Sequence, residues 1–208
     1  MSRFTRSVLL LAAAVPMSLP ASTFINFETF PGGAVIPDST VLTNQFPGIT
    51  FTNTIVYNDL LSLPPALPPD SGENAASDDG GPISITFASP IASFSGYFTY
   101  FVALTMDAYG PTNNLVASES SAFSSNIAGG GGDPGSLPNE LISVAFPSGI
   151  STVTITGDPD GTSFAMDDIT YTGVQPSPEP ATLGYSVLTA LASLLVIARK
   201  RRAAILKP

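Results

Sequence analysis

The sequence has no histidine, no cysteine and no tryptophan, and only 11% of its 208 residues are charged. Without histidine, Ser–His–Asp and Cys–His catalysis are unavailable. Without cysteine, the chain has no disulfide, no thiolate metal site and no thiol nucleophile. These absences exclude the most common mechanisms of nucleophilic catalysis.

Positive charge is absent from the whole middle of the chain. The seven basic residues all lie in the first six or the last ten positions, whereas residues 22–174 hold fifteen of the sixteen acidic residues and no Lys or Arg. The formal charge of this segment is therefore 0 − 15 = −15. Because such a segment cannot neutralise phosphate groups, its composition argues against nucleic-acid binding.

The N-terminus has the order of features of a secretory signal peptide. Arg3 and Arg6 precede a short apolar run over residues 7–15, and a proline-containing stretch follows, up to the small residue Ala21. Positive charge, apolar run and small residues in this order are typical of a cleaved export signal. We predict that residues 1–21 are a signal peptide, with cleavage near Ala21, and that residues 22–174 are exported.

The C-terminus contains a candidate transmembrane helix. Residues 181–198 carry no charge, and at about 1.5 Å per helical residue they would span roughly 27 Å, close to the thickness of the bilayer hydrocarbon. A basic cluster follows, which keeps residues 203–208 in the cytoplasm under the positive-inside rule. Residues 22–174 then lie across the membrane, the topology that the signal peptide also predicts.

Three features in this region resemble the PEP-CTERM sorting signal: a Pro-Glu-Pro tripeptide, a short apolar helix and a basic cluster near the C-terminus. They lie within residues 175–202, and the motif residues are Pro178, Glu179, Pro180, Arg199, Lys200, Arg201 and Arg202. The resemblance implies recognition by an exosortase-type membrane protease, removal of the tail, and delivery to the cell surface or the biofilm matrix of exopolysaccharide. It implies nothing about the fold of the exported part. A plain membrane anchor that is never cleaved is the alternative.

Residues 22–174 show the period-two alternation of β-strands, as in Ile83, Ile85 and Phe87 with polar residues between them. Turn residues separate the candidate strands, for example at 147–149, and two long loops are expected at 61–82 and 126–140. About nine short strands favour an all-β domain, a β-sandwich of jelly-roll type. The predicted strands are 24–30, 48–57, 83–87, 93–101, 103–109, 113–119, 142–146, 152–156 and 163–172.

The last predicted strand contains two adjacent acids, Asp167 and Asp168. Strict alternation would place the apolar residues before and after them on opposite faces, so we predict a β-bulge at this pair, which brings all four to one face. The bulge would also turn a carboxylate and a free carbonyl toward one point. The four apolar residues are Phe164, Met166, Ile169 and Tyr171.

Carboxylates, hydroxyls and carbonyls are the abundant polar groups of this segment, and they suit a hard cation such as Ca²⁺, which takes six to eight oxygen ligands. Glu28 on the first predicted strand, together with the acids of the last strand, resembles jelly rolls of the carbohydrate-binding-module type. The resemblance implies a structural Ca²⁺ held by Glu28 with Asp167 or Asp168. Solvated acids at a sheet edge are the alternative.

A second candidate cation site is the turn Asp158-Pro-Asp160-Gly161. It presents two carboxylates two residues apart, and the glycine permits a tight bend. The turn lacks the glutamate at the twelfth position that completes an EF-hand loop. An ordinary Asp-Gly turn is the alternative.

Three functions remain open, and we predict the first: a non-catalytic exported protein of the cell surface or matrix. The second is a module that binds extracellular polysaccharide. The third, a glycan hydrolase, needs two facing carboxylates, which adjacent acids on a regular strand do not provide. Tyrosines can replace the missing tryptophan as sugar platforms, although the sequence favours a core or strand-edge aromatic for each of them. The candidates are Tyr57, Tyr97, Tyr100 and Tyr109.

Overall fold

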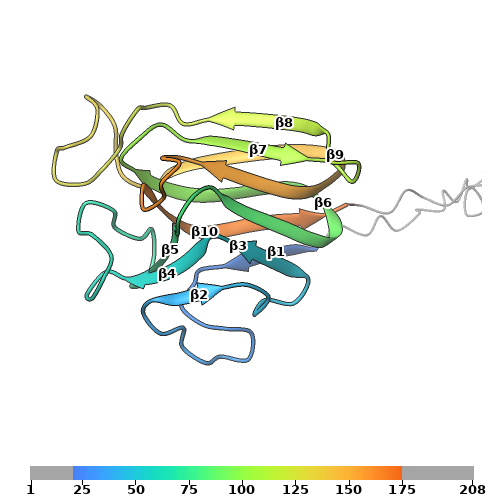
Figure 1. Cartoon of the computed structure of the whole chain (residues 1–208), viewed down its shortest axis with the longest axis horizontal. Coiled ribbons are helices and arrows are strands. Elements are labelled where there is room, and N and C mark those ends of the chain that lie inside the picture. The colour runs from blue at the N-terminus through green and yellow to red at the C-terminus, as the bar shows by residue number, and fades with distance from the viewer. Residues whose placement is uncertain (1–20, 175–208) are drawn as a thin grey trace, which may run out of the picture. The chain divides into compact units, whose positions relative to one another are not determined.

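The computed structural model describes residues 21–174, so the predicted signal peptide, sorting segment and transmembrane helix lie outside the described residues. The described part consists of ten antiparallel strands (Figure 1), and none of its residues forms a helix that could cross a membrane. The strands are β1 Ser22–Ile25, β2 Thr40–Leu42, β3 Ile49–Thr52, β4 Thr54–Asn58, β5 Asn74–Asp78, β6 Ile83–Tyr100, β7 Thr105–Tyr109, β8 Leu115–Ser120, β9 Glu140–Thr156 and β10 Phe164–Gly173.

Hydrogen bonds join the strands in the order β2-β4-β5-β10-β6-β9-β7-β8, with β1 beside β10 and β3 beside β6. The long strands β6 and β9 belong to two layers. Their 91–100 and 140–145 parts lie with β10, β1, β5, β4 and β2 in the first layer, and their 83–87 and 150–156 parts lie with β3, β7 and β8 in the second. Figure 1 shows β7 and β8 on one side of the molecule and β2 and β4 on the other. The predicted all-β sandwich of jelly-roll type is confirmed.

The two long strands bend where they pass between the layers. Register shifts surround Ile91 of β6, and the facing stretch of β9 contains Pro147–Gly149. The sequence prediction of a turn at 147–149, and of separate strands on each side of it, is therefore wrong. A local irregularity lets a strand bend and continue, so proline and glycine mark a bend here and not an end.

Two strands, β2 and β5, escaped prediction. β5 lies inside residues 61–82, which the sequence analysis expected to be a loop, yet all five of its residues are buried. Its sequence, Asn-Ala-Ala-Ser-Asp, has no β-branched or aromatic residue and so lacks the usual strand pattern. The predicted strand 48–57 is in fact β3 and β4, divided at Asn53, whose φ is 53°.

The core lies between the layers and is rich in phenylalanine. On β6, Ile83, Ile85, Phe94 and Phe98 are all fully buried, and the ring centroid of Phe98 lies 6.1 Å from that of Phe164 on β10. Burying one such side chain contributes roughly 1.5–3 kcal/mol. Because inward and outward positions alternate, this packing also determines which side chains of β6 point away from the core.

Gly161, in the turn before β10, packs closely against Gly80, in the turn between β5 and β6. Its φ is 85°, and a Cβ atom there would lie 2.5 Å from the backbone nitrogen of Gly80. Gly33 has a similar φ of 88° but nothing within 4 Å. We expect Gly33→Ala to lower the free energy of unfolding by about 1–2 kcal/mol, the cost of a positive φ. Gly161→Ala should lower it by clearly more in urea denaturation, and equal losses would contradict the close packing of the two turns.

Candidate functional site

The predicted bulge in the last strand is confirmed. Asp167 and Thr170 of β10 pair with Tyr97 and Ser95 of β6, so β10 has one extra residue, Asp168, whose φ is 49°. The extra residue places both apolar pairs of β10 on the core side. They are the residues named from the sequence: Phe164, Met166, Ile169 and Tyr171.

Asp167 points away from the core but is only 1% exposed, because residues 70 and 71 cover it. Its Oδ2 accepts hydrogen bonds from the backbone N–H groups of Asp70 and Ser71, both at 2.9 Å. Its Oδ1 accepts one from the N–H of Asp168 at 2.7 Å. Burial raises the pKa of Asp167 to about 7, although the hydrogen bonds from Ser71, Asp168 and Asp70 act in the opposite direction.

Glu28 holds the other end of the same segment. It lies just beyond β1, and not on the first strand as predicted. Its Oε1 accepts hydrogen bonds from the N–H groups of Glu73 and Asn74, both at 2.8 Å. The carboxylate lies so close to Gly72 that a Cβ atom there would be 2.2 Å from Oε1. Glu28 and Asp167 therefore hold residues 70–74 between them.

The two carboxylates lie near one segment but are engaged with backbone N–H groups. A calcium ion at Glu28 and Asp167 would share these carboxylate oxygens with the backbone donors. Asp168 contacts the same segment, since its Oδ1 accepts a hydrogen bond from the Ser71 hydroxyl at 2.9 Å. Within residues 21–174, no group of three or more acidic residues is arranged to hold a metal ion. Calcium binding stays a prediction.

The second candidate, residues 158–161, forms a compact turn. The Oδ1 of Asp158 accepts a hydrogen bond from the N–H of Asp160 at 2.9 Å, and its carbonyl accepts one from Gly161 at 3.1 Å. Side-chain oxygens of aspartate commonly stabilise turns in this way. Asp160 itself is exposed.

Sequence reasoning missed the structural role of Asp78, which it placed in a loop. Asp78 ends β5 and is fully buried. Its carboxylate accepts hydrogen bonds from the N–H of Ser163 at 2.8 Å, the hydroxyl of Ser163 at 2.7 Å and the N–H of Phe164 at 3.2 Å. The side chain thus anchors the start of β10, and no local pattern could have indicated a partner 85 residues away.

Residues 59–73, here called the covering segment, lie over part of the outer face of the first layer. Leu63 and Leu67 pack there against Ala75 of β5 and Ala165 of β10, in a small cluster separate from the main core. The carbonyl of Pro69 accepts a hydrogen bond from the amide group of Asn139 at 3.1 Å. The covering segment therefore closes one half of this outer face and leaves the other half open.

The open half carries hydroxyl and apolar side chains and no charged one. Strand pairing places its residues in rows: Phe24 beside Thr170, then Ser95, then Ser143. In the next row, the hydroxyl oxygens of Ser93 and Thr172 are 2.6 Å apart. We call this surface the hydroxyl face. It consists of Ser22, Phe24, Ser93, Ser95, Tyr97, Leu141, Ser143, Thr170 and Thr172.

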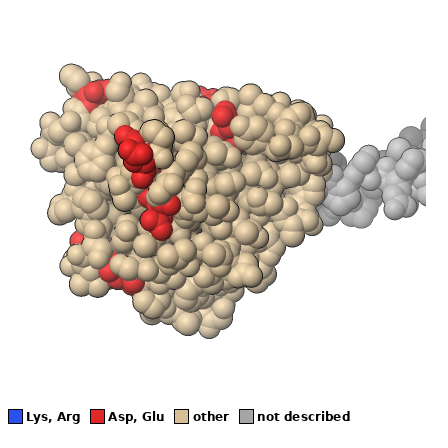
Figure 2. Space-filling view, in the orientation of Figure 1, with Lys and Arg blue, Asp and Glu red and all other residues tan. Residues whose placement is uncertain are grey.

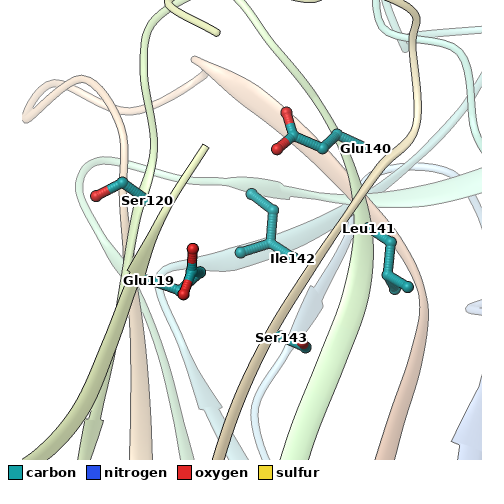
Figure 3. Close-up of a pocket in the computed structure, with 6 residues that line it drawn as sticks. All are labelled: Glu119, Ser120, Glu140, Leu141, Ile142 and Ser143. Atoms are coloured by element: carbon teal, nitrogen blue, oxygen red, sulfur yellow. The ribbon is translucent and has the colours of Figure 1, made fainter. Parts of the chain in front are cut away.

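A pocket of about 310 Å³ adjoins this face at the open edge between β8 and β9. Figure 3 shows Glu119 of β8 and Glu140 of β9 on opposite sides of the opening. Leu141 and Ser143 belong both to the pocket and to the hydroxyl face, so the two surfaces are continuous. The remaining lining residues are Ser120 and Ile142.

Glu140 is held in place by two donors. Its Oε1 accepts a hydrogen bond from the N–H of Ala122 at 2.8 Å, and its Oε2 accepts one from the hydroxyl of Tyr100. Burial, and then the hydrogen bond to Glu140, raise the pKa of Tyr100 to about 12. Glu119 is exposed and faces the pocket from the other layer.

The four candidate tyrosines have different environments. Tyr100 is fully buried and is a core residue, as the sequence analysis favoured, and so it cannot serve as a sugar platform. Tyr97 is half-buried at the border of the hydroxyl face, where it pairs with Asp167, and Tyr109 is half-buried on β7 in the second layer. Tyr57 lines a separate pocket of about 340 Å³ with Ser62, Pro64, Leu67, Ser77 and Thr162.

The solved structures that the domain is similar to include an adhesin domain and carbohydrate-binding modules. The K2 cleaved adhesin domain of Lys-gingipain has 13% identity and a TM-score of 0.45, over 73% of this chain and 99% of that one. CBM35 from Paenibacillus barcinonensis has 18% identity and a TM-score of 0.37, over 73% and 98%. A family 29 carbohydrate-binding module has 9% identity and a TM-score of 0.37, over 77% and 99%. No protein-family model and no curated protein matches the chain.

The environment of Asp167 predicts a specific pH dependence of stability. Its pKa of about 7 in the fold exceeds the ordinary value of 3.8, so folding favours the protonated carboxyl. Its contribution is complete below about pH 4 and is lost as the pH rises through about 7, on the order of 2–4 kcal/mol. Asp167→Asn cannot titrate, so we expect its free energy of unfolding in urea to change less between pH 4.5 and 7.5 than that of the wild type. Asp59→Asn, at an exposed aspartate, should retain the wild-type slope, and an unchanged slope in Asp167→Asn would contradict the assignment.

Proposed function

We propose that the chain is a non-catalytic exported protein of the cell surface or extracellular matrix, and that its sandwich domain binds polysaccharide. The observation that supports this most strongly is the hydroxyl face. It joins four strands, carries hydroxyl groups in rows and has Tyr97 at its border with the covering segment. The proposal places an extended glycan across these rows, with its end in the pocket between β8 and β9.

The chemistry of the face matches that of a sugar chain. Serine and threonine hydroxyls both donate and accept hydrogen bonds, as sugar hydroxyls do. An aromatic ring with a polar tip packs against the apolar face of a sugar ring and keeps its own hydroxyl in water. Tyr97 offers such a ring, and Leu141, paired with it on β9, is 56% exposed. A few fixed polar groups beside apolar contacts are typical of ligand sites.

The two glutamates of the pocket do not support a hydrolase. Glycoside hydrolysis needs one carboxyl group that gives a proton to the leaving group and a second that acts as base or nucleophile. Both oxygens of Glu140 already accept hydrogen bonds from protein donors. Glu140 is thus engaged by protein donors, and Glu119 is exposed on the opposite strand. We therefore assign the pocket to binding and not to catalysis.

Export and sorting rest on the sequence. The signal peptide, the Pro178-Glu179-Pro180 tripeptide, the apolar segment and the basic cluster support delivery through the PEP-CTERM route. The proposal is that the chain is anchored transiently by residues 181–198, that an exosortase-type protease removes the tail, and that the domain is released to the surface or the exopolysaccharide matrix.

Tyr97→Ala tests the binding site. We expect the wild-type domain, residues 22–174, to be retarded in native gels that contain a bound polysaccharide, and Tyr97→Ala to lose at least tenfold in affinity. Loss of a stacking aromatic in a sugar site removes both apolar contact and orientation. Tyr109→Ala, at a half-buried tyrosine of the other layer, is the matched control and should bind normally. Equal binding by all three proteins would show that the polysaccharide does not bind at the hydroxyl face.

Glu179→Ala tests the sorting step. In a host that has an exosortase, we expect the wild-type chain to be recovered without its tail, as measured by the intact mass of the exported product. Glu179→Ala should keep the tail and remain in the membrane fraction, whereas Ser177→Ala, two residues upstream, should be processed normally. A tail that is retained in the wild type would leave only the plain membrane anchor.

A further inference from the structure

The charge of the exported segment restricts which polysaccharide can occupy the hydroxyl face. Residues 22–174 hold fifteen acidic residues and no Lys or Arg. The side of the domain in Figure 2 accordingly shows acidic patches and no basic residue. An anionic glycan would find no cationic partner on residues 22–174, and it would meet a negative potential from the whole domain.

The carboxylates also lie close to the hydroxyl face at two of its borders. Glu119 and Glu140 line the pocket at the β9 edge. At the β10 border, Asp168 directly follows the residue that pairs with Tyr97. Asp70 lies next to Asp168, and its pKa is raised by burial first and by the Asp168 carboxylate second. The face itself contains no charged side chain, so its polar groups are neutral while its borders are negative.

We infer that the hydroxyl face binds an uncharged polysaccharide and rejects glycans that carry carboxylate or sulfate groups. The inference rests on the proposed function and specifies its substrate class. Hydroxyl side chains recognise a neutral sugar without any ionic contribution, so its affinity is independent of salt. Like charges placed against each other in an interface oppose binding strongly, and salt screens this repulsion only in part, since the Debye length is about 8 Å at physiological ionic strength.

The experiment compares neutral and anionic probes on the domain comprising residues 22–174. Neutral glucan, mannan and xylan, and the anionic alginate and polygalacturonate, are tested by affinity electrophoresis and calorimetry in 20, 150 and 500 mM NaCl with chelator present. We expect at least one neutral glycan to bind with a dissociation constant that changes less than twofold across the salt series. Alginate and polygalacturonate should not bind at 20 mM NaCl.

A pair of charge variants locates the repulsion. Glu119→Lys and Asp59→Lys change the net charge equally, but only Glu119 lines the pocket. We expect Glu119→Lys to acquire measurable binding of polygalacturonate at 20 mM NaCl, at least tenfold above Asp59→Lys, while Asp59→Lys binds the neutral glycan as the wild type does. Equal gains by the two variants would mean that the total charge, and not the border of the face, sets the selectivity.

The outcomes separate the two proposals. If an anionic glycan binds the wild type more tightly than every neutral one, and Tyr97→Ala abolishes that binding, polysaccharide binding stands and the inferred neutrality is overturned. If no neutral or anionic glycan binds in any of the three salt concentrations, the proposed function itself is rejected. Neutral binding that is lost in Tyr97→Ala and is insensitive to salt supports both.

Discussion

Asp167 is only 1% exposed, and its carboxylate accepts hydrogen bonds from three backbone N–H groups. The arrangement of the outer surface of the first layer depends on these hydrogen bonds. Regular alternation from Met166 points the Asp167 carboxylate toward the covering segment, and the hydrogen bonds from residues 70 and 71 hold that segment on the sheet. Glu28 holds the next residues in the same way. Residues 22–174 contain no Lys or Arg, and their acids Asp167 and Glu28 are therefore stabilised by backbone donors in place of ion pairs.

This use of carboxylates connects the fold to the proposed binding surface. The covering segment closes the outer face over β4, β5 and the start of β10, where a small apolar cluster forms beneath it. The rest of the same face, from β1 to β9, stays open and carries the hydroxyl face. If the segment lay further along the sheet, it would bury Tyr97, which is the neighbour of Asp167 on β6. The buried aspartate thus determines where the covered surface ends.

The sequence analysis predicted the fold class, most strands and the bulge in β10, because each depends on local alternation of apolar and polar residues. It failed where a strand had no such pattern. β5 is a run of small and polar residues, and all five are buried between the neighbouring strands β4 and β10. Pro147 and Gly149 were taken for a turn, although β9 continues through them, because pairing with β6 maintains the strand on both sides of the bend.

The candidate site divides in the same way. Composition by itself determined that residues 22–174 have no cationic group, no imidazole and no thiol, since a missing side chain is missing in any fold. The predicted export and sorting features also consist of short stretches of consecutive residues, which the sequence shows directly. Only the tertiary structure decided that Tyr100 is buried and Tyr97 open, that Asp78 anchors Ser163, and that serine and threonine residues from four strands share one face. These outcomes depend on pairings between residues far apart in the chain, which strand register sets and local sequence does not encode.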